Sequence, residues 1–234
     1  MLKVEAYNTY YGDLPVLRDF AIEVQAGEIV CLLGRNGAGK TTALKSILGL
    51  VPPKSGRLEL DGLDLSSLPA EQIPRAGIGY VPQGRRLFKE MTVRENLEIG
   101  LMTRKSGPDA FKRALSYFPP LIERLEQRSG TLSGGEQTMV AIARALCVEP
   151  KVIMLDEPTE GLMPSMIQAI RDVVTRLRDD GVAVLLVEQR IDAVLPVADR
   201  IAFMDQGTVQ AEFGVDAVKA DVSLVQKYLG VGQG

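Results

Sequence analysis

Short apolar runs, separated by glycine, proline and acidic residues, form the main pattern of this chain. Three of them, residues 29–33, 152–155 and 182–187, are apolar throughout. A continuous apolar run of this length is typical of a strand that is buried on both faces of a parallel sheet. Between such runs, apolar residues recur at helical spacing over residues 42–48, 93–101, 109–118 and 164–179. This alternation predicts an α/β fold with a mainly parallel sheet.

Other segments predict smaller elements around that sheet. Residues 2–25 alternate apolar and polar positions and predict an antiparallel β region that turns near Gly12 and Asp13. We expect hairpin strands at 56–62 and 201–209, a strand at 78–81, a short helix at 69–75 and a closing helix at 215–229. Helical spacing dominates from about residue 84 to 148, which predicts a helical subdomain inserted in the core. With no internal repeat or linker, residues 1–234 are predicted to form one domain.

Composition narrows the class of protein. The chain is 46% hydrophobic and 24% charged, as expected for a soluble globular chain with a sizeable core. Its net charge of −3, with both signs interspersed, argues against a nucleic-acid partner. No apolar run approaches the roughly 18 residues of a spanning helix, and the N-terminus lacks a signal-peptide core, which favours the cytoplasm. The chain has no histidine, which excludes histidine catalysis and histidine-ligated metals.

Residues 34–41 carry the strongest chemical signal, because they fit the pattern G-x-x-x-x-G-K-[ST] between a predicted strand and a predicted helix. Glycines let backbone N–H groups approach phosphate oxygens, and the helix N-terminus adds partial positive charge. Lys40 is expected to reach the β- and γ-phosphates, and the Thr41 hydroxyl to ligate Mg²⁺. The predicted cofactor-binding residues here are Gly34, Asn36, Gly37, Ala38, Gly39, Lys40, Thr41 and Thr42. A plain glycine-rich turn is the alternative.

Polar residues at the ends of two predicted strands are candidates for the chemistry. Asp156 and Glu157 follow the run 152–155, and ligands of open α/β sheets bind at that end of the strands. Asp156 is predicted to hold Mg²⁺ through water, and Glu157 to polarise an attacking water. Gln83 follows the strand 78–81, where its carboxamide could bind Mg²⁺ or orient water. From the residues alone, a plain turn residue is the better interpretation of Gln83.

Two further motifs are ambiguous by themselves. Ser133 and Glu136 form a capping-box pattern before a predicted helix, and the intervening glycines, including Gly135, leave helix N–H groups open to an anion. Tyr11 precedes the first turn, where an aromatic ring could stack on a base. A half-buried strand tyrosine is the simpler interpretation. Cys31 and Cys147 stand in apolar surroundings that indicate core thiols.

Together these motifs closely resemble the ATP-binding-cassette (ABC) ATPase family over nearly the whole chain. The resemblance implies a phosphate-loop fold that binds ATP and Mg²⁺, with Glu157 as the catalytic glutamate. It makes Gln83 the glutamine of the family's Q-loop and residues 132–136, Leu-Ser-Gly-Gly-Glu, its signature motif. It also places Tyr11 where the family has its adenine-stacking aromatic, which reverses the interpretation above.

Two departures from the family pattern point to one branch. Gln189 stands where the family has a switch histidine, and Met163 stands where an aspartate usually contacts the opposite subunit. Both resemble the second ATPase subunit of branched-chain amino acid importers and of their urea and amide relatives. We rank branched-chain amino acids first as the transported solute, and urea or short amides second.

The resemblance also implies how such a subunit works. Two domains would face each other head to tail, the second being a sister ATPase or a second copy. Each ATP would lie between the catalytic and metal-binding residues of one subunit and Ser133 and Gly135 of the other. The implied set on the first subunit is Lys40, Thr41, Gln83, Asp156, Glu157 and Gln189.

The implied partners are integral-membrane permease subunits, reached at the cytoplasmic face of the inner membrane, and indirectly a periplasmic or extracellular solute-binding protein. We expect residues 84–88 to contact the permease. A soluble ABC ATPase acting on ribosomes or DNA is disfavoured, because the chain has one cassette and no basic extension. A regulator that binds nucleotide without hydrolysis is disfavoured by Glu157.

Overall fold

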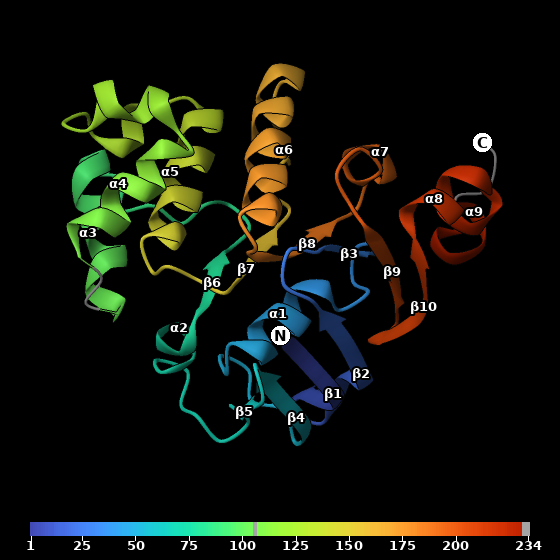
Figure 1. Cartoon of the computed structure of the whole chain (residues 1–234). Helices are drawn as coiled ribbons and strands as arrows, with labels where there is room; N and C mark the ends of the chain where they lie inside the picture. The colour runs from blue at the N-terminus through green and yellow to red at the C-terminus, as the bar shows by residue number, and fades with distance from the viewer. Residues whose placement is uncertain (105–106, 231–234) are drawn as a thin grey trace.

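The computed structural model describes residues 1–104 and 107–230 and contains two β-sheets (Figure 1). The larger sheet has the strand order β10-β9-β3-β8-β7-β6, in which only the edge strand β10 is antiparallel to its neighbour. The smaller sheet is antiparallel, with the order β2-β1-β4-β5. A mainly parallel sheet beside an N-terminal antiparallel region confirms the predicted fold class.

The strand bounds follow the apolar runs closely. In the larger sheet they are β3 Ile29–Leu33, β6 Ile78–Val81, β7 Val152–Asp156, β8 Ala183–Glu188, β9 Arg200–Asp205 and β10 Thr208–Gly214. In the smaller sheet they are β1 Leu2–Tyr11, β2 Leu14–Val24, β4 Ser55–Leu60 and β5 Leu63–Asp64.

Both faces of the central strands β3, β7 and β8 are buried, which explains why these strands are apolar until they end. In β3, Val30 and Leu32 belong to the core between the two sheets, whereas Cys31 belongs to the core on the far face. Helix α1 (Lys40–Ile47) packs in the first of these cores through Leu44 and Ile47. The helix that follows the glycine loop is therefore held between the two sheets (Figure 1).

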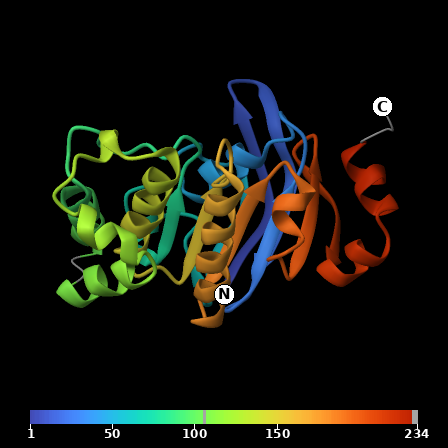
Figure 2. The same ribbon diagram turned by 90° about the horizontal axis from the view of Figure 1, so that it is seen from above.

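The remaining helices cover the far face and the two ends of the large sheet. The segment between β6 and β7 contains α3 (Val93–Arg104), α4 (Pro108–Ser116), two 3₁₀ turns (Pro119–Arg124 and Ser129–Thr131) and α5 (Gly134–Leu146). Helix α6 (Pro164–Asp179) packs on the sheet beside them. Figures 1 and 2 show the green and yellow helices α3, α4 and α5 at one end of the sheet, α6 in orange beside them, and the C-terminal helices, in red, at the other end. Among the described residues, none of the helices combines the length and apolar character needed to cross a bilayer.

Two local predictions need correction, and one short helix has no predicted counterpart. The predicted closing helix is two helices, α8 (Val215–Ala220) and α9 (Ser223–Leu229), because Asp221 is extended and its carboxylate accepts bonds from the Ser223 N–H and Oγ at 2.9 and 2.6 Å. The helix predicted at 69–75 is a turn over residues 69–72 followed by the short helix α2 (Ile73–Ala76). The single-turn helix α7 (Ile191–Val194) was not predicted.

A glycine in the middle of α3 sets how closely this helix approaches α5. A Cβ added at Gly100 would lie 2.3 Å from the Arg144 carbonyl oxygen and 2.9 Å from the Cys147 Cβ. Alanine normally stabilises a helix interior relative to glycine, but here the backbone of α5 blocks the added methyl group.

We therefore expect Gly100→Ala to lower the free energy of unfolding by roughly 1–3 kcal/mol, the usual cost of overpacking. Urea denaturation measures this change. Met102→Ala on the same helix is the control, since Met102 is 77% exposed and should change stability by less than about 0.5 kcal/mol. Equal stability of Gly100→Ala and the native chain would contradict the assigned packing.

Candidate functional site

Three adjacent parallel strands deliver the site residues to one edge of the large sheet. Strands β3, β8 and β7 are neighbours, with Leu33 opposite Glu188 and Asp156 opposite Val187. The loop after β3 starts α1, and the acidic and amide residues follow β7 and β8. At this edge lies a pocket of about 350 Å³, which is lined by Val16, Asn36, Gly37, Gly39, Lys40, Thr41, Thr42, Gln83, Glu157 and Gln189.

The glycine loop has the backbone that a phosphate cradle requires. Gly37 and Gly39 have φ of 82° and 106°, in the left-handed region, and Gly39 is the residue from which α1 starts. A Cβ at Gly34 would lie 2.4 Å from the Met204 carbonyl oxygen, so only glycine fits there. Because the first turn of a helix has unpaired N–H groups, the start of α1 presents partial positive charge to the pocket.

Lys40 is buried at the mouth of that loop. Its Nζ donates to the Gly34 and Arg35 carbonyl oxygens at 2.7 and 3.0 Å and lies 3.9 Å from Glu157 Oε1. Only 5% of the residue is exposed, and this burial lowers the pKa of Lys40, opposed by the nearby charges of Glu157 and Asp156. A bound phosphate oxygen would replace these two uncharged carbonyl oxygens with a charged hydrogen-bond acceptor for the Lys40 ammonium.

Thr41 and Asp156 form a compact pair of oxygen donors. The Thr41 hydroxyl donates to Asp156 Oδ1 at 3.3 Å, and the Tyr80 hydroxyl donates to Oδ2 at 3.4 Å. Burial raises the pKa of Asp156, as does the adjacent Glu157 charge. Within the described part of the chain, no cluster of three histidine, cysteine, aspartate or glutamate side chains could hold a metal by itself. One carboxylate and one hydroxyl fit Mg²⁺, which keeps waters and takes phosphate oxygens as further ligands.

Glu157 is the centre of the hydrogen bonds in the site. Its Oε2 accepts from the side-chain amides of Gln83 at 3.1 Å and Gln189 at 2.5 Å, and Gln83 also donates to Glu160 Oε2 at 3.0 Å. Glu157 has φ of 49°, an unfavourable conformation for glutamate, and its N–H donates to the Val187 carbonyl. The four residues predicted to be catalytic, Lys40, Gln83, Glu157 and Gln189, thus lie together.

Tyr11, Ser133 and Gly135, which are predicted to bind nucleotide, lie outside both the glycine loop and this pocket, whereas Gly34 and Ala38 belong to the loop without lining the pocket. Tyr11 is 48% exposed at the end of β1, and Val16 of β2 is the residue from this hairpin that lines the pocket. Ser133 and Gly135 lie at the start of α5, where the predicted capping box is present: Ser133 Oγ accepts from the Glu136 N–H and Glu136 Oε2 accepts from the Ser133 N–H. If Ser133 and Gly135 bind nucleotide, it must come from outside this chain's own phosphate pocket.

Sequence reasoning missed a buried carboxylate beside the site. Glu188 is 4% exposed at the end of β8 and accepts from the Thr159 hydroxyl at 2.7 Å and the Thr159 N–H at 3.4 Å. Burial raises the pKa of Glu188. These bonds tie the turn after Glu157 to β8. The available signal was an acidic residue directly after a buried apolar run, but nothing local indicated Thr159 as its partner.

Comparison with known proteins gives a consistent family. The family profile described as "ABC transporter" matches residues 17–160. The chain is 43% identical to the high-affinity branched-chain amino acid transport ATP-binding protein BraG of Pseudomonas aeruginosa, over 98% of this chain and all of that protein. It is 39% identical to the probable branched-chain amino acid transport ATP-binding protein LivF of Archaeoglobus fulgidus, over 89% and 90% of the two chains.

Solved structures agree with the sequence comparisons. The ADP conformation of MJ1267, an ATP-binding cassette of an ABC transporter, is 29% identical and superposes with a TM-score of 0.87 over 100% of this chain and 99% of that one. A dimeric post-hydrolysis state of the cassette MJ0796, bound to ADP and Pi, is 27% identical with a TM-score of 0.82, over 92% and 99%. The resemblance inferred from the motifs is confirmed.

The buried Glu188 leads to a pH-dependent prediction for stability. Because its pKa is higher in the folded chain than in the unfolded chain, the unfolded state loses this proton first as pH rises. Ionisation of Glu188 therefore lowers the free energy of unfolding as the pH rises above the ordinary glutamate range. Glu188→Gln removes that loss and keeps an oxygen to accept from Thr159. The stability of the variant relative to the native chain should thus be greater at pH 8 than at pH 5.

Urea denaturation at the two pH values measures this difference. The control is Glu98→Gln, an exposed carboxylate on α3, for which the relative stability should barely change between the two pH values. A Glu188→Gln variant whose relative stability is the same at both pH values would contradict the burial of a charged carboxylate here.

Proposed function

The chain belongs to the ABC transporter family, and from that premise we propose that it is the ATP-hydrolysing subunit of a branched-chain amino acid importer. BraG and LivF, both named for branched-chain amino acid transport, support this solute. The observation that carries the hydrolytic role is the convergence of Lys40, Gln83 and Gln189 on the Glu157 carboxylate at the phosphate loop. An importer of urea or short amides is the alternative for the same subunit.

In this proposal, Glu157 orients the water that attacks the γ-phosphate and accepts its proton. Two amides hold Oε2, so the carboxylate is fixed by groups that donate hydrogen bonds without adding charge. Lys40 exchanges the Gly34 and Arg35 carbonyls for phosphate oxygens and stabilises the negative charge that develops there. The first turn of α1 binds the same phosphates through its N–H groups.

Thr41 and Asp156 are the residues that would hold Mg²⁺, and Gln83, which lines the same pocket as Thr41, would join them. Mg²⁺ bound there would neutralise phosphate charge. The Thr41 hydroxyl, now bonded to Asp156, would turn its oxygen to the ion, and Asp156 would act through an intervening water. Tyr80 keeps the carboxylate of Asp156 oriented by donating to its other oxygen.

We propose that Ser133 and Gly135 bind the ATP held by a second ABC ATPase subunit, in a head-to-tail dimer with a sister ATPase or a second copy. The first turn of α5 lies outside the chain's own phosphate pocket, and the solved MJ0796 cassette is a dimer. Tyr11 is proposed to contact the adenine at the edge of the site beyond Val16. Residues 1–234 are proposed to act as one nucleotide-binding domain, with 84–148 as its helical subdomain.

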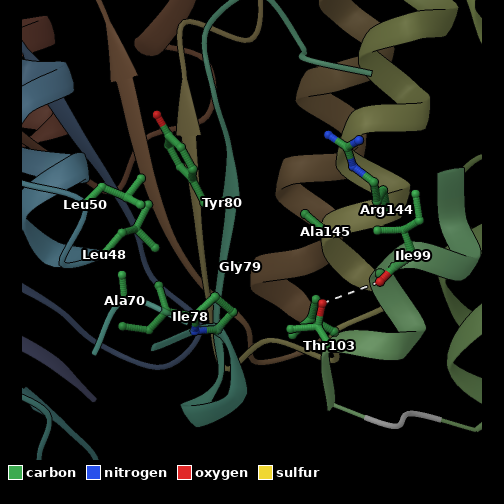
Figure 3. Close-up of a pocket in the computed structure, with 13 residues that line it drawn as sticks. Leu48, Leu50, Ala70, Ile78, Gly79, Tyr80, Ile99, Thr103, Arg144 and Ala145 are labelled. Carbon is green, nitrogen blue, oxygen red and sulfur yellow. Dashed lines mark hydrogen bonds between the residues drawn. The ribbon is translucent and has the colours of Figure 1, made fainter. Parts of the chain in front are cut away.

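An apolar pocket beside the helices is our candidate for permease contact (Figure 3). It encloses about 280 Å³ between the end of α1, α2, β6, α3 and α5. Leu48 and Leu50 line one side, and Ile99 and Thr103 line the other. Phe88, within the predicted contact segment 84–88, is 51% exposed and lies over Arg144, which also lines the pocket.

An apolar segment of an integral-membrane permease would fill this pocket and hold the subunit at the cytoplasmic face of the inner membrane. A solute-binding protein would act indirectly, through the permease. We propose no nucleic-acid partner.

The hydrolytic role is tested by Glu157→Gln. The variant keeps the hydrogen-bonding shape of the site but cannot take a proton from water, so ATP hydrolysis should fall by about 10²- to 10⁴-fold. Phosphate release is measured at rising protein concentration, with and without the sister ATPase and permease. ATP binding, followed with a fluorescent ATP analogue, should persist. A variant that hydrolyses ATP at the native rate in the complete complex would exclude Glu157 as the base.

The permease pocket is tested by placing a charge in it. Leu50→Glu should abolish co-purification with the permease, because an apolar partner segment cannot solvate a carboxylate. Leu63→Glu is the matched control, since Leu63 is similarly exposed, 62% against 58%, but lies on β5 outside this pocket. Thermal unfolding checks that both variants fold. If Leu50→Glu captured the permease as well as the native chain does, the permease would have to bind outside this pocket.

A further inference from the structure

The turn that follows Gln83 has an unusual backbone. Gly84, Arg85 and Arg86 have φ of 75°, 67° and 43°, so three consecutive residues are left-handed. Glycine adopts this region freely, but arginine does so at a cost that the surrounding structure must offset.

Two arginines connect helix α5 to this turn, Arg144 on the helix and Arg85 in the turn. The Arg144 guanidinium donates to the carbonyl oxygens of Arg85 and Arg86 at 3.4 and 3.0 Å. Arg85 in turn points its side chain at α5, where its Nε donates to the Thr138 hydroxyl at 2.9 Å. Arg85, predicted from the sequence as a permease contact, therefore has its guanidinium engaged inside the chain.

The Arg85 contact reaches the first turn of α5. Thr138 is 1% exposed, and its hydroxyl donates a hydrogen bond to the Gly134 carbonyl oxygen at 3.1 Å. The Arg85 guanidinium also lies against Gly134, 3.2 Å from the position a Cβ would take. Gly134 stands between Ser133 and Gly135, the residues proposed to bind the other subunit's ATP. Arg85 thus lies against the segment that serves the second ATP.

Gln83, the residue directly before the turn, lines the chain's own phosphate pocket. Gln83 donates to Glu157 and Glu160 in this structure. A γ-phosphate and its Mg²⁺ would compete for the Gln83 amide and for the water-orienting side of Glu157. Only Gly84 separates Gln83 from Arg85, so a shift of Gln83 would also displace Arg85. The strained backbone of this turn makes its conformation sensitive to such a shift.

We propose that Arg85 is a positioning residue that couples occupancy of the chain's own phosphate site to the first turn of α5. This inference rests on the proposed function, because it assigns α5 to the second ATP of a dimer. It gives the two ATP sites a direct route of communication, from Gln83 through residues 84–86 to Thr138 and Gly134. The coupling depends on the bond from Arg85 to Thr138.

Arg86 provides a matched control. It has the same side chain, the same left-handed backbone and the next position in the chain. Over residues 1–104 and 107–230, its side chain makes no hydrogen bond or ion pair, and Arg86 is exposed. Arg85→Ala and Arg86→Ala therefore remove the same charge from the same turn, and only the first removes the bond to Thr138.

Hydrogen exchange of the full chain, read by mass spectrometry, tests the coupling without requiring hydrolysis or a partner. The probe is the non-hydrolysable analogue AMP-PNP with Mg²⁺, added at saturation. In the native chain and in Arg86→Ala, the analogue should change exchange over residues 132–138 by roughly fivefold or more. In Arg85→Ala this change should disappear, while the affinity for the analogue stays within about twofold.

Thr138 provides a second test from the other side of the contact. Thr138→Val keeps the shape but removes the hydroxyl, so it should abolish the response as Arg85→Ala does, and Thr138→Ser should restore it. This pair remains informative if Arg85→Ala fails to fold. The inference is wrong if Arg85→Ala or Thr138→Val responds like the native chain, if Arg86→Ala loses the response equally, or if the native chain shows none.

These outcomes are distinct from a failure of the proposed function. If the native chain does not bind the analogue, the phosphate site itself is refuted and the inference falls with it. If the chain binds the analogue and shows the coupling but neither hydrolyses ATP nor captures a permease, the proposed function fails while the link from Arg85 to α5 stands.

Discussion

The parallel register of β3, β8 and β7 is the constraint on which the site depends. Because both faces of these strands are buried, their side chains are apolar until each strand ends. Glu188 lies opposite Leu33, and Asp156 lies opposite Val187, the residue before Glu188, so the polar chemistry of three distant segments begins at one edge. Helix α1 is held between the two sheets, which fixes the phosphate loop against this edge. A one-residue slip in any of these strands would turn its final side chain to the opposite face.

Charge is the second constraint, because the buried carboxylates Asp156, Glu157 and Glu188 lie near the buried ammonium of Lys40. Burial raises the pKa of Asp156 and of Glu188, and it lowers the pKa of Lys40. The chain has no histidine, and it surrounds Glu157 with the neutral amides of Gln83 and Gln189 instead. An amide donates a hydrogen bond whatever the pH near neutrality, so the orientation of Glu157 does not depend on the titration of its partners. Its φ of 49° is offset by the backbone bond to Val187 and by these amides.

The helical segment is joined to this edge mainly through α5 and the turn after Gln83. Helix α5 packs on the large sheet and also holds the turn through Arg144, and the apolar pocket in Figure 3 lies between these same elements. Its first turn carries a complete capping box, which satisfies its own N-terminal donors only in part. A permease segment in the pocket and a phosphate beside Gln83 would act on the same short stretch of chain.

The sequence determined what is local. It predicted the fold class, the phosphate loop, the acids after β7 and the capping box at Ser133, because each depends on residues that are neighbours in the chain. Tertiary structure alone decided which distant groups meet. The bonds of Lys40 to its own loop, the pairing of Glu188 with Thr159, and the position of Val16 rather than Tyr11 in the pocket depend on strand register and side-chain direction. Arg85 is the clearest case. In the sequence it is one arginine of a polar loop, where water could solvate its guanidinium. Only the packing of α5 beside that loop brings the Thr138 hydroxyl within hydrogen-bond distance of Arg85.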